Sequence, residues 1–257
     1  MDKYQIPNLA KACRALSWLA AERGAYSASE VARKLQMPRT TAFRVLRTLC
    51  AEGLVEEADG RYRAGAGLLR LGLLALQTVE IHSLAEPVLQ RLARATGETA
   101  HLAVRTGDQM LILQVADSPN PIRVASRPGT LVLIHCAATG KALLAALPPA
   151  RARAILRGRP LQRRTDRTIT TVAALETELE ATRRQGYAVD DEEYHVGVRC
   201  LAAPVFDARG DVVAALGITA ATLRFAKRKI PVVAREVTRA AESLSDALGQ
   251  RLTGRTA

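Results

Sequence analysis

The sequence has few cysteines and no long apolar run, and both absences exclude common classes of protein. Its four cysteines lie far apart with no C-x-x-C pair, so a disulfide scaffold is excluded. Each cysteine has apolar neighbours and is predicted to be a buried, reduced thiol. No apolar run approaches the roughly 18 residues of a membrane span, and the N-terminus has no apolar core of a signal peptide. We therefore expect a cytoplasmic protein without a membrane partner.

Motifs of common enzymes are also missing. The stretch ATGKALL resembles a phosphate-binding loop, but that motif needs a glycine where the chain has His135 and a Ser or Thr where it has Ala142. No G-x-S-x-G occurs, and the four histidines form no H-E-x-x-H. We therefore expect no enzymatic activity, no cofactor and no metal site. The alternative is a small-molecule enzyme with a basic accessory domain.

Basic residues outnumber acidic ones. The chain carries 37 Lys and Arg against 25 Asp and Glu, a formal net charge of +12. Such a surplus favours a polyanionic partner, because Lys and Arg displace counterions from a phosphate backbone. Arginine and alanine are both abundant, however, and that bias is also typical of genome composition. Charge alone therefore leaves a nucleic-acid partner open.

Residues 1–65 carry the signals of three helices and a hairpin. Apolar residues at helical spacing predict a helix over Asn8–Arg23, and Ser27-Ala-Ser-Glu30 is a capping box that opens a shorter one. The stretch MPRTTAFRVLRTLCAEG predicts a third helix, with Pro38 in its first turn and Gly53 after its end. The second and third helices, joined by a tight turn, match a helix-turn-helix unit.

The third helix has a basic outer face, and a basic hairpin follows it. Arginines lie opposite the apolar stripe of the helix, and the arginine fork suits guanine edges and phosphates. Ala58-Asp59-Gly60 is a turn signal between two short strands, which predicts a wing. This order favours a winged helix-turn-helix over the alternative, a small helical bundle with a solvated basic face. The residues predicted to contact DNA are Ser27, Arg39, Thr40, Thr41, Arg44, Arg47, Arg61 and Arg63.

A leucine-rich segment, GLLRLGLLALQTVEIH, begins at Gly67. It is too apolar to face water and too short to cross a bilayer. We interpret residues 66–79 as a linker helix buried against another element or another subunit. A core helix of the following domain is the alternative.

From residue 80 to 257, helices are grouped around consecutive strands, which predicts an α+β domain with a mostly antiparallel sheet flanked by helices. A second capping box, Ser83-x-x-Glu86, predicts the start of a helix that runs to Gly97. Further helices are expected over Ala137–Leu147 and Thr171–Gln185 and from Pro231 onward. Strands are expected over residues 98–106, 110–117, 121–126, 187–193, 198–206 and 211–220.

Taken together, several stretches resemble the IclR family of bacterial transcription regulators over nearly the whole chain. They include MPRTTAFRVLRTLCAEGLVEE, ETAHLAVRTGDQMLILQ, IHCAATGKALLA, YAVDDEEYHVGVRC and VVAALGIT. The resemblance implies an N-terminal winged helix-turn-helix, a linker helix and a C-terminal effector domain similar to GAF and PAS sensors. It also implies operator DNA and a small-molecule effector, a carboxylate metabolite, as partners, and a homodimer or homotetramer.

The resemblance further implies where the effector binds. The matching positions are Ala138, Thr139, Gly140, Asp190, Val198, Cys200, Gly217 and Thr219. In keto-acid sensors of the family, serines stand where this chain has Gly217 and Thr219, so the glycine is expected to leave room for a larger aromatic or sugar acid.

The acid run at residues 190–193 has two interpretations. A carboxylate at a strand end, beside glycines and a thiol, is typical of a ligand site in an apolar cavity. In that interpretation Asp191 to Tyr194 form a solvated loop and the acids are not a catalytic pair. The alternative is a zinc site made by Asp190, Cys200 and a histidine.

Overall fold

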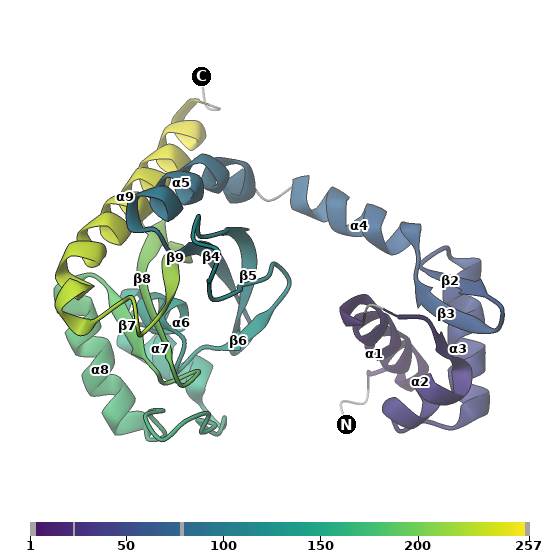
Figure 1. Cartoon of the computed structure of the whole chain (residues 1–257). Coiled ribbons are helices and arrows are strands. Elements are labelled where there is room, and N and C mark those ends of the chain that lie inside the picture. The colour runs from purple at the N-terminus through teal and green to yellow at the C-terminus, as the bar shows by residue number, and fades with distance from the viewer. Residues whose placement is uncertain (1–3, 23, 78–79, 255–257) are drawn as a thin grey trace. The chain divides into compact units, whose positions relative to one another are not determined.

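The computed structural model describes residues 4–22, 24–77 and 80–254. The chain forms two compact units, Met1–Val79 and Glu80–Ala257 (Figure 1). Each unit has a separate apolar core. Within the described ranges no single helix has the length and apolar composition to cross a membrane, and only the bent pair Ala66–Leu76 and Glu80–Thr96, taken together, has both.

The first unit is a winged helix-turn-helix, as predicted. Three helices pack around buried apolar side chains that include Leu19, Leu46 and Tyr62. A three-stranded antiparallel sheet in the order β1-β3-β2 completes the unit, and its hairpin excludes the plain helical bundle. The elements are α1 (Pro7–Ala21), β1 (Tyr26–Ser27), α2 (Ala28–Lys34), α3 (Arg39–Ala51), β2 (Val55–Ala58) and β3 (Arg61–Ala64).

Local signals in the sequence account for this unit. The Ser27 hydroxyl accepts a hydrogen bond from the Glu30 N–H at 3.3 Å, and the Glu30 carboxylate accepts one from the Ser27 N–H at 2.8 Å. The predicted capping box is therefore confirmed. In the hairpin, Asp59 and Gly60 adopt φ of 51° and 72°, the left-handed backbone that a two-residue turn requires.

Helix α4 (Ala66–Gln77) follows the wing and contacts β2. Its leucines are largely exposed: 66% of Leu69, 53% of Leu73 and 46% of Leu74. Since α4 belongs to the first unit, its interpretation as a core helix of the following domain is wrong. Burial of its leucines against another subunit remains a prediction.

The second unit is built on one six-stranded sheet in the order β6-β5-β4-β9-β8-β7. Every pair of neighbouring strands is antiparallel, as expected from strands that follow one another through short turns. The strands are β4 (Thr99–Thr106), β5 (Gln109–Ala116), β6 (Leu131–Leu133), β7 (Ala188–Asp191), β8 (Val198–Phe206) and β9 (Val212–Ala221).

Helices cover both faces of this sheet (Figure 1), which confirms the predicted α+β class. Helices α5 and α9 pack together on one face, and α6 packs against β8 and β9 on the other, with α8 beside it. The helices are α5 (Glu80–Thr96), α6 (Ala138–Ala146), α7 (Pro149–Leu156), α8 (Val172–Gln185), the short 3-10 helix η1 (Lys227–Lys229) and α9 (Ile230–Gly254).

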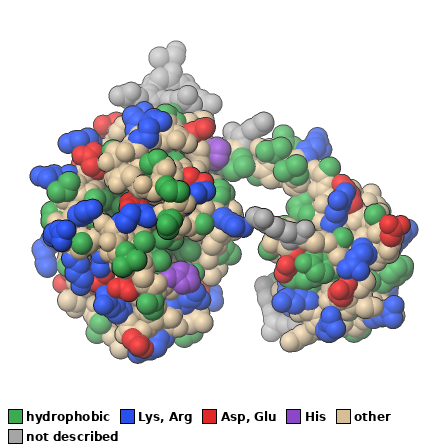
Figure 2. Space-filling model, viewed as in Figure 1, with side chains coloured by type: hydrophobic (Ala, Val, Ile, Leu, Met, Phe, Trp, Pro, Cys, Tyr) green, Lys and Arg blue, Asp and Glu red, His purple; other side chains and the backbone are tan. Residues whose placement is uncertain are grey.

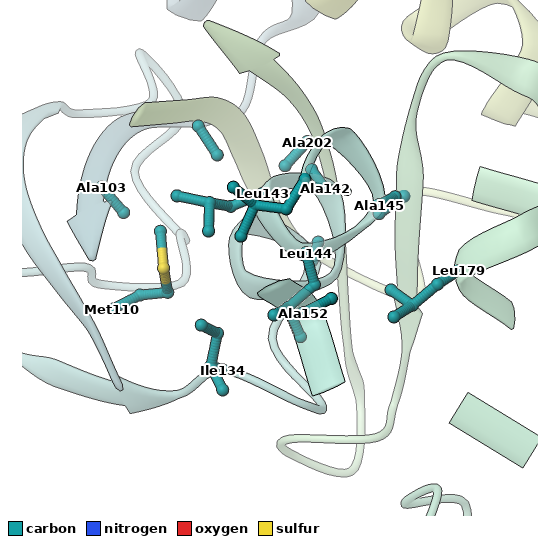
Figure 3. Packing of buried hydrophobic residues seen from close by; sticks show 14 of the residues in the cluster. Ala103, Met110, Ile134, Ala142, Leu143, Leu144, Ala145, Ala152, Leu179 and Ala202 are labelled. Carbon is teal, nitrogen blue, oxygen red and sulfur yellow. The ribbon is translucent and has the colours of Figure 1, made fainter. Parts of the chain in front are cut away.

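Helix α6 is the centre of the larger core. Its residues from Ala138 to Ala145 are all buried. Small side chains let it approach the sheet closely, and Figure 3 shows Ala142 beside Ala202 of β8 and Leu144 beside Ala152 of α7. A helix buried on every side holds its N-terminal turn rigidly in place.

Three sequence predictions for local structure are wrong. Ser83 does not cap a helix, because α5 is already helical at Glu80, and the Ser83 hydroxyl donates to the Glu80 carbonyl at 3.0 Å. Residues 121–126 form no strand; the edge strand is β6, and Thr99 holds this segment by donating to the Val124 carbonyl at 3.0 Å. Cys13 is exposed, although its apolar neighbours predicted burial.

Candidate functional site

A cavity of about 230 Å³ lies in the second unit, between the N-terminal end of α6 and the adjoining ends of β7, β8 and β9. Apolar side chains make up part of its wall, and polar groups converge on it from several elements, the usual composition of a ligand site. Its lining residues are His101, Ile112, Val124, Ala125, Ser126, Arg127, Thr130, Val132, Ala137, Thr139, Asp190, Tyr194, His195, Val198, Cys200 and Thr219.

The cavity brings together most of the positions that the family resemblance implied. Thr139, Asp190, Val198, Cys200 and Thr219 line it. The other three positions, Ala138, Gly140 and Gly217, are not part of its lining.

The two glycines are explained by packing. A Cβ added at Gly140 would overlap the carbonyl oxygen of Ile134, and one added at Gly217 would overlap the carbonyl oxygen of Leu201. Each glycine therefore permits a close approach between backbones. The expectation that Gly217 enlarges the effector site is wrong, because the space beside it is filled by β8.

Gly140→Ala is expected to destabilise the second unit by about 1–3 kcal/mol, because the added methyl group must displace backbone. Gly249→Ala is the matched control, since a Cβ there meets no atom within 4 Å. Alanine in an unhindered helical position gains up to about 1 kcal/mol. Urea unfolding of both variants measures the difference, and a neutral or stabilising Gly140→Ala would contradict the close packing.

The N-terminal end of α6 borders the cavity. Its N-cap, Ala137, supplies no side-chain hydrogen bond, and both Ala137 and Thr139 line the cavity. The first N–H groups of a helix have no partner inside the helix, and the helix dipole adds partial positive charge there. This end of the cavity therefore favours a negatively charged group.

Three polar side chains on neighbouring strands form a chain of contacts. Cys200 Sγ lies 3.3 Å from Thr219 Oγ1, and Thr219 Oγ1 lies 3.5 Å from His101 Nδ1. Burial lowers the pKa of His101 to about 4, so its ring is neutral near pH 7. Burial also raises the pKa of the Cys200 thiol, which is therefore protonated. These groups offer hydrogen bonds without a net charge.

Asp190 is the acid of this site. Its side chain is 2% exposed, and Oδ1 accepts hydrogen bonds from the N–H groups of Glu193 at 2.7 Å and Tyr194 at 3.2 Å. Burial raises the pKa of Asp190 to about 7, although those two hydrogen bonds act in the opposite direction.

The rest of the acid run is not a solvated loop, which corrects the sequence interpretation. Asp191 pairs with Arg199 at 2.8 Å and with Lys227 at 2.8 Å. Glu192 follows the end of β7 and has a φ of 64°. Glu193 is 7% exposed. Because successive side chains of a strand point to opposite faces, Asp190 faces the cavity while Asp191 faces the cations.

Glu193 pairs with Lys141, a residue that sequence reasoning set aside once the phosphate-loop motif failed. Lys141 is fully buried in α6, and its Nζ donates to Glu193, to Glu178 of α8 at 3.0 Å and to the Val189 carbonyl. Burial lowers the pKa of Lys141, but the two carboxylates outweigh it and leave the pKa raised. The ammonium group therefore ties α6, α8 and the turn after β7 together behind the cavity.

Sequence reasoning also missed the wall made by residues 124–127 with Thr130 and the rings of His101, Tyr194 and His195. No motif marks them, because they come from separate elements. The zinc alternative has no support, since the described residues contain no group of three or more His, Cys, Asp or Glu able to hold a metal.

In the first unit, α3 presents the predicted DNA contacts. Arg39, Thr40, Arg44 and Arg47 are exposed opposite the buried stripe, and Thr41 is half-buried. Ser27 is already committed to its capping box. Figure 2 shows Lys and Arg side chains on the visible face of both units, so overall charge does not by itself locate a DNA site.

Several of these arginines have intramolecular partners. Arg63 donates twice to Glu56, at 3.1 and 2.9 Å, and Arg61 donates to the Ala25 carbonyl at 3.0 Å. Arg47 lies 3.9 Å from Glu57. Arg39 and Arg44 form no ion pair with any described residue. DNA could therefore bind these two arginines of α3 without first breaking an intramolecular ion pair.

Comparison with known proteins agrees with this architecture. The profile of the IclR helix-turn-helix domain matches residues 8–59, and that of the bacterial transcriptional regulator IclR C-terminal matches residues 73–246. HTH-type transcriptional regulator BhcR of Paracoccus denitrificans is 37% identical over 253 residues, covering 97% of this chain and 90% of the relative. HTH-type transcriptional regulator KdgR of Escherichia coli is 35% identical over 223 residues, covering 86% of this chain and 85% of the relative.

Solved structures show the same fold. The crystal structure of Thermotoga maritima IclR has a TM-score of 0.77 and 32% identity, covering 95% of this chain and 100% of that one. An IclR homolog from Microbacterium hydrocarbonoxydans, complexed with 4-hydroxybenzoate, has a TM-score of 0.81 and 26% identity, covering 94% and 98%.

A winged helix-turn-helix followed by a unit with a polar cavity defines a transcriptional regulator with a DNA-binding domain and an effector domain. The chain belongs to the IclR family of bacterial transcriptional regulators. It is accordingly a regulator and not an enzyme.

Proposed function

We propose that this protein controls a catabolic operon by sensing a small organic acid, or a similarly polar metabolite, in the cavity of its second unit. The observation that carries the proposal is the uncapped first turn of α6 at the cavity wall, where N–H groups favour a carboxylate. The homolog complexed with 4-hydroxybenzoate supports a carboxylate ligand.

Within this proposal each part of the chain has one task. Residues 1–65 bind operator DNA in the cytoplasm, the segment 66–79, of which 78 and 79 lie outside the described residues, is the linker, and 80–257 bind the effector. The exposed leucines of α4 are then buried in a homodimer, which can pair again into a homotetramer. The effector shifts operator affinity only by binding two arrangements of the domains unequally.

The proposal is tested with a set of organic acids and the full-length protein. A ligand that binds only the folded state raises the melting temperature. An acid that does so should also change the affinity for duplexes selected by the protein from a random library. If no acid raises the melting temperature, the ligand class is wrong.

Thr219→Val is expected to weaken effector binding about 3–10-fold, the loss of one hydrogen bond. Asp190→Ala should weaken it at least as much, because the turn at Glu193 and Tyr194 loses its acceptor. Effector-free DNA binding should stay unchanged in both. Thr177→Val, on the exposed face of α8, is the matched control. Calorimetric titration gives the affinities, and wild-type values in both cavity variants would place the effector elsewhere.

A further inference from the structure

Asp190 lines the same cavity as the N-terminal end of α6. That helix end favours an anion, which an ionised Asp190 would repel. Among its neighbours in the acid run, Asp191, Glu192 and Glu193 each form an ion pair with a Lys or Arg. Asp190 has no such pair with any described residue, and it is buried. An ionised carboxylate placed there would be desolvated without a compensating cation, which is costly.

The groups around Asp190 do not supply that cation. On its own segment, Glu193 and Tyr194 contribute N–H groups, and the Glu193 carboxylate adds negative charge nearby. The titratable and charged groups on other segments are Cys200 on β8, His101 on β4, Cys136 before α6, Lys141 on α6, and Arg127 and His195 on the cavity wall. Arg164 is a further cation nearby, but it is exposed, its guanidinium lies over the Tyr194 ring at 4.7 Å, and it forms no ion pair with Asp190 in the described part of the chain.

Most of these are neutral or already engaged. Burial keeps Cys200 protonated and His101 neutral. Lys141 is committed to Glu193 and Glu178, so its charge is already balanced. Arg127 is exposed on its loop and forms no ion pair with Asp190 in the described part of the chain. The local environment therefore favours the neutral form of Asp190.

We propose that Asp190 takes part in effector binding as a neutral acid, whose hydroxyl donates a hydrogen bond to the carboxylate of the ligand. Oδ1 is held by two backbone N–H groups, so the proton is assigned to Oδ2, with the Cys200 thiol as a further hydrogen-bonding neighbour of the carboxyl group. The inference rests on the proposed function, since it concerns an organic acid in the same cavity. The proton makes Asp190 select for anions, whereas an ionised Asp190 would repel them and accept only ligand donors.

Effector binding should then weaken as the pH rises. Burial raises the pKa of Asp190 to about 7 in the free protein. A ligand that requires the protonated form of Asp190 binds with full affinity below that pKa. Above it, the affinity falls about tenfold per pH unit. Between about pH 6 and about pH 8.5 the dissociation constant should rise about 30-fold.

Calorimetric titration of the full-length protein with lactate, gluconate and 4-hydroxybenzoate at the two pH values tests this. Asp190→Asn keeps the acceptor and presents a fixed N–H donor, so its affinity should change less than about 3-fold over that range. The amide of whichever acid binds is the ligand control. Because it is uncharged, its affinity should depend on pH much less.

His195 also lines the cavity, so it requires its own control. His195→Gln should keep the 30-fold dependence. A dependence that survives in Asp190→Asn, or disappears in His195→Gln, would overturn the role of Asp190. If Asp190→Asn does not fold, the His195→Gln result decides.

The remaining outcomes separate the two proposals. If an acid binds equally well, or more tightly, at the higher pH, the neutral acid is refuted while the organic-acid effector stands. If none of the three acids binds at either pH, the proposed ligand class fails and the inference fails with it.

Discussion

Lys141→Met is expected to destabilise the second unit by about 3–5 kcal/mol. Lys141 is fully buried and is the only Lys or Arg paired with Glu193 among the described residues. Without it, a carboxylate that is 7% exposed remains in the core with no counter-charge. The second oxygen of Glu193 already makes no hydrogen bond in the described part of the chain. Urea unfolding of the full-length protein measures the loss.

The double variant Lys141→Met with Glu193→Leu should recover much of that stability. Replacing a buried ion pair by apolar side chains is often close to neutral, whereas removing one partner is not. Lys229→Met, at an exposed position of η1, is the matched control and should change the free energy of unfolding by less than about 0.5 kcal/mol. A single Lys141→Met variant as stable as wild type would show that the ion pair is not what holds Glu193 in the core.

Arg44→Ala is expected to weaken binding to a selected operator duplex by about 1–3 kcal/mol, or roughly 5- to 150-fold, if Arg44 reads a base. Arg44 is exposed on α3 and forms no ion pair with any described residue, so the positive charge of its guanidinium group is fully available to DNA. Arg47→Ala should cost less, because Glu57 lies 3.9 Å away and competes for the guanidinium group.

Two further variants show what kind of contact Arg44 makes. Arg44→Lys keeps the charge but loses the fork, so it should bind as tightly as wild type only if Arg44 touches phosphate alone. Arg209→Ala, at an exposed turn of the second unit, removes the same charge and is the control. Fluorescence anisotropy over a range of salt concentrations gives affinities and slopes. If a folded Arg44→Ala protein binds DNA with wild-type affinity, Arg44 does not contribute to the DNA interface.

Much of the fold follows from the sequence because its signals are local. The capping box at Ser27, the turn at Asp59-Gly60 and the apolar stripe of α3 each depend on residues within a few positions of one another. The same holds for the short, mainly apolar runs that form β8 and β9. Sequence by itself therefore determined the winged helix-turn-helix and the antiparallel sheet.

The family resemblance led to Asp190, Cys200 and Thr219, and the structure places these three side chains on one cavity. It did not show what the other implied positions do. At both Gly140 and Gly217 two backbones meet, and that requirement is invisible until the neighbouring strand or turn is in place.

Only the tertiary structure determined where the charged side chains lie and which of them are buried. The sequence placed Asp190 at a ligand site and Asp191 to Tyr194 in a solvated loop. The structure confirms that Asp190 lines the cavity, but it pairs Asp191 with cations and buries Glu193 in the core. Lys141 and Glu193 are 52 positions apart. Whether such a charge is buried depends on which distant elements pack around it, and no pattern of neighbouring residues encodes that.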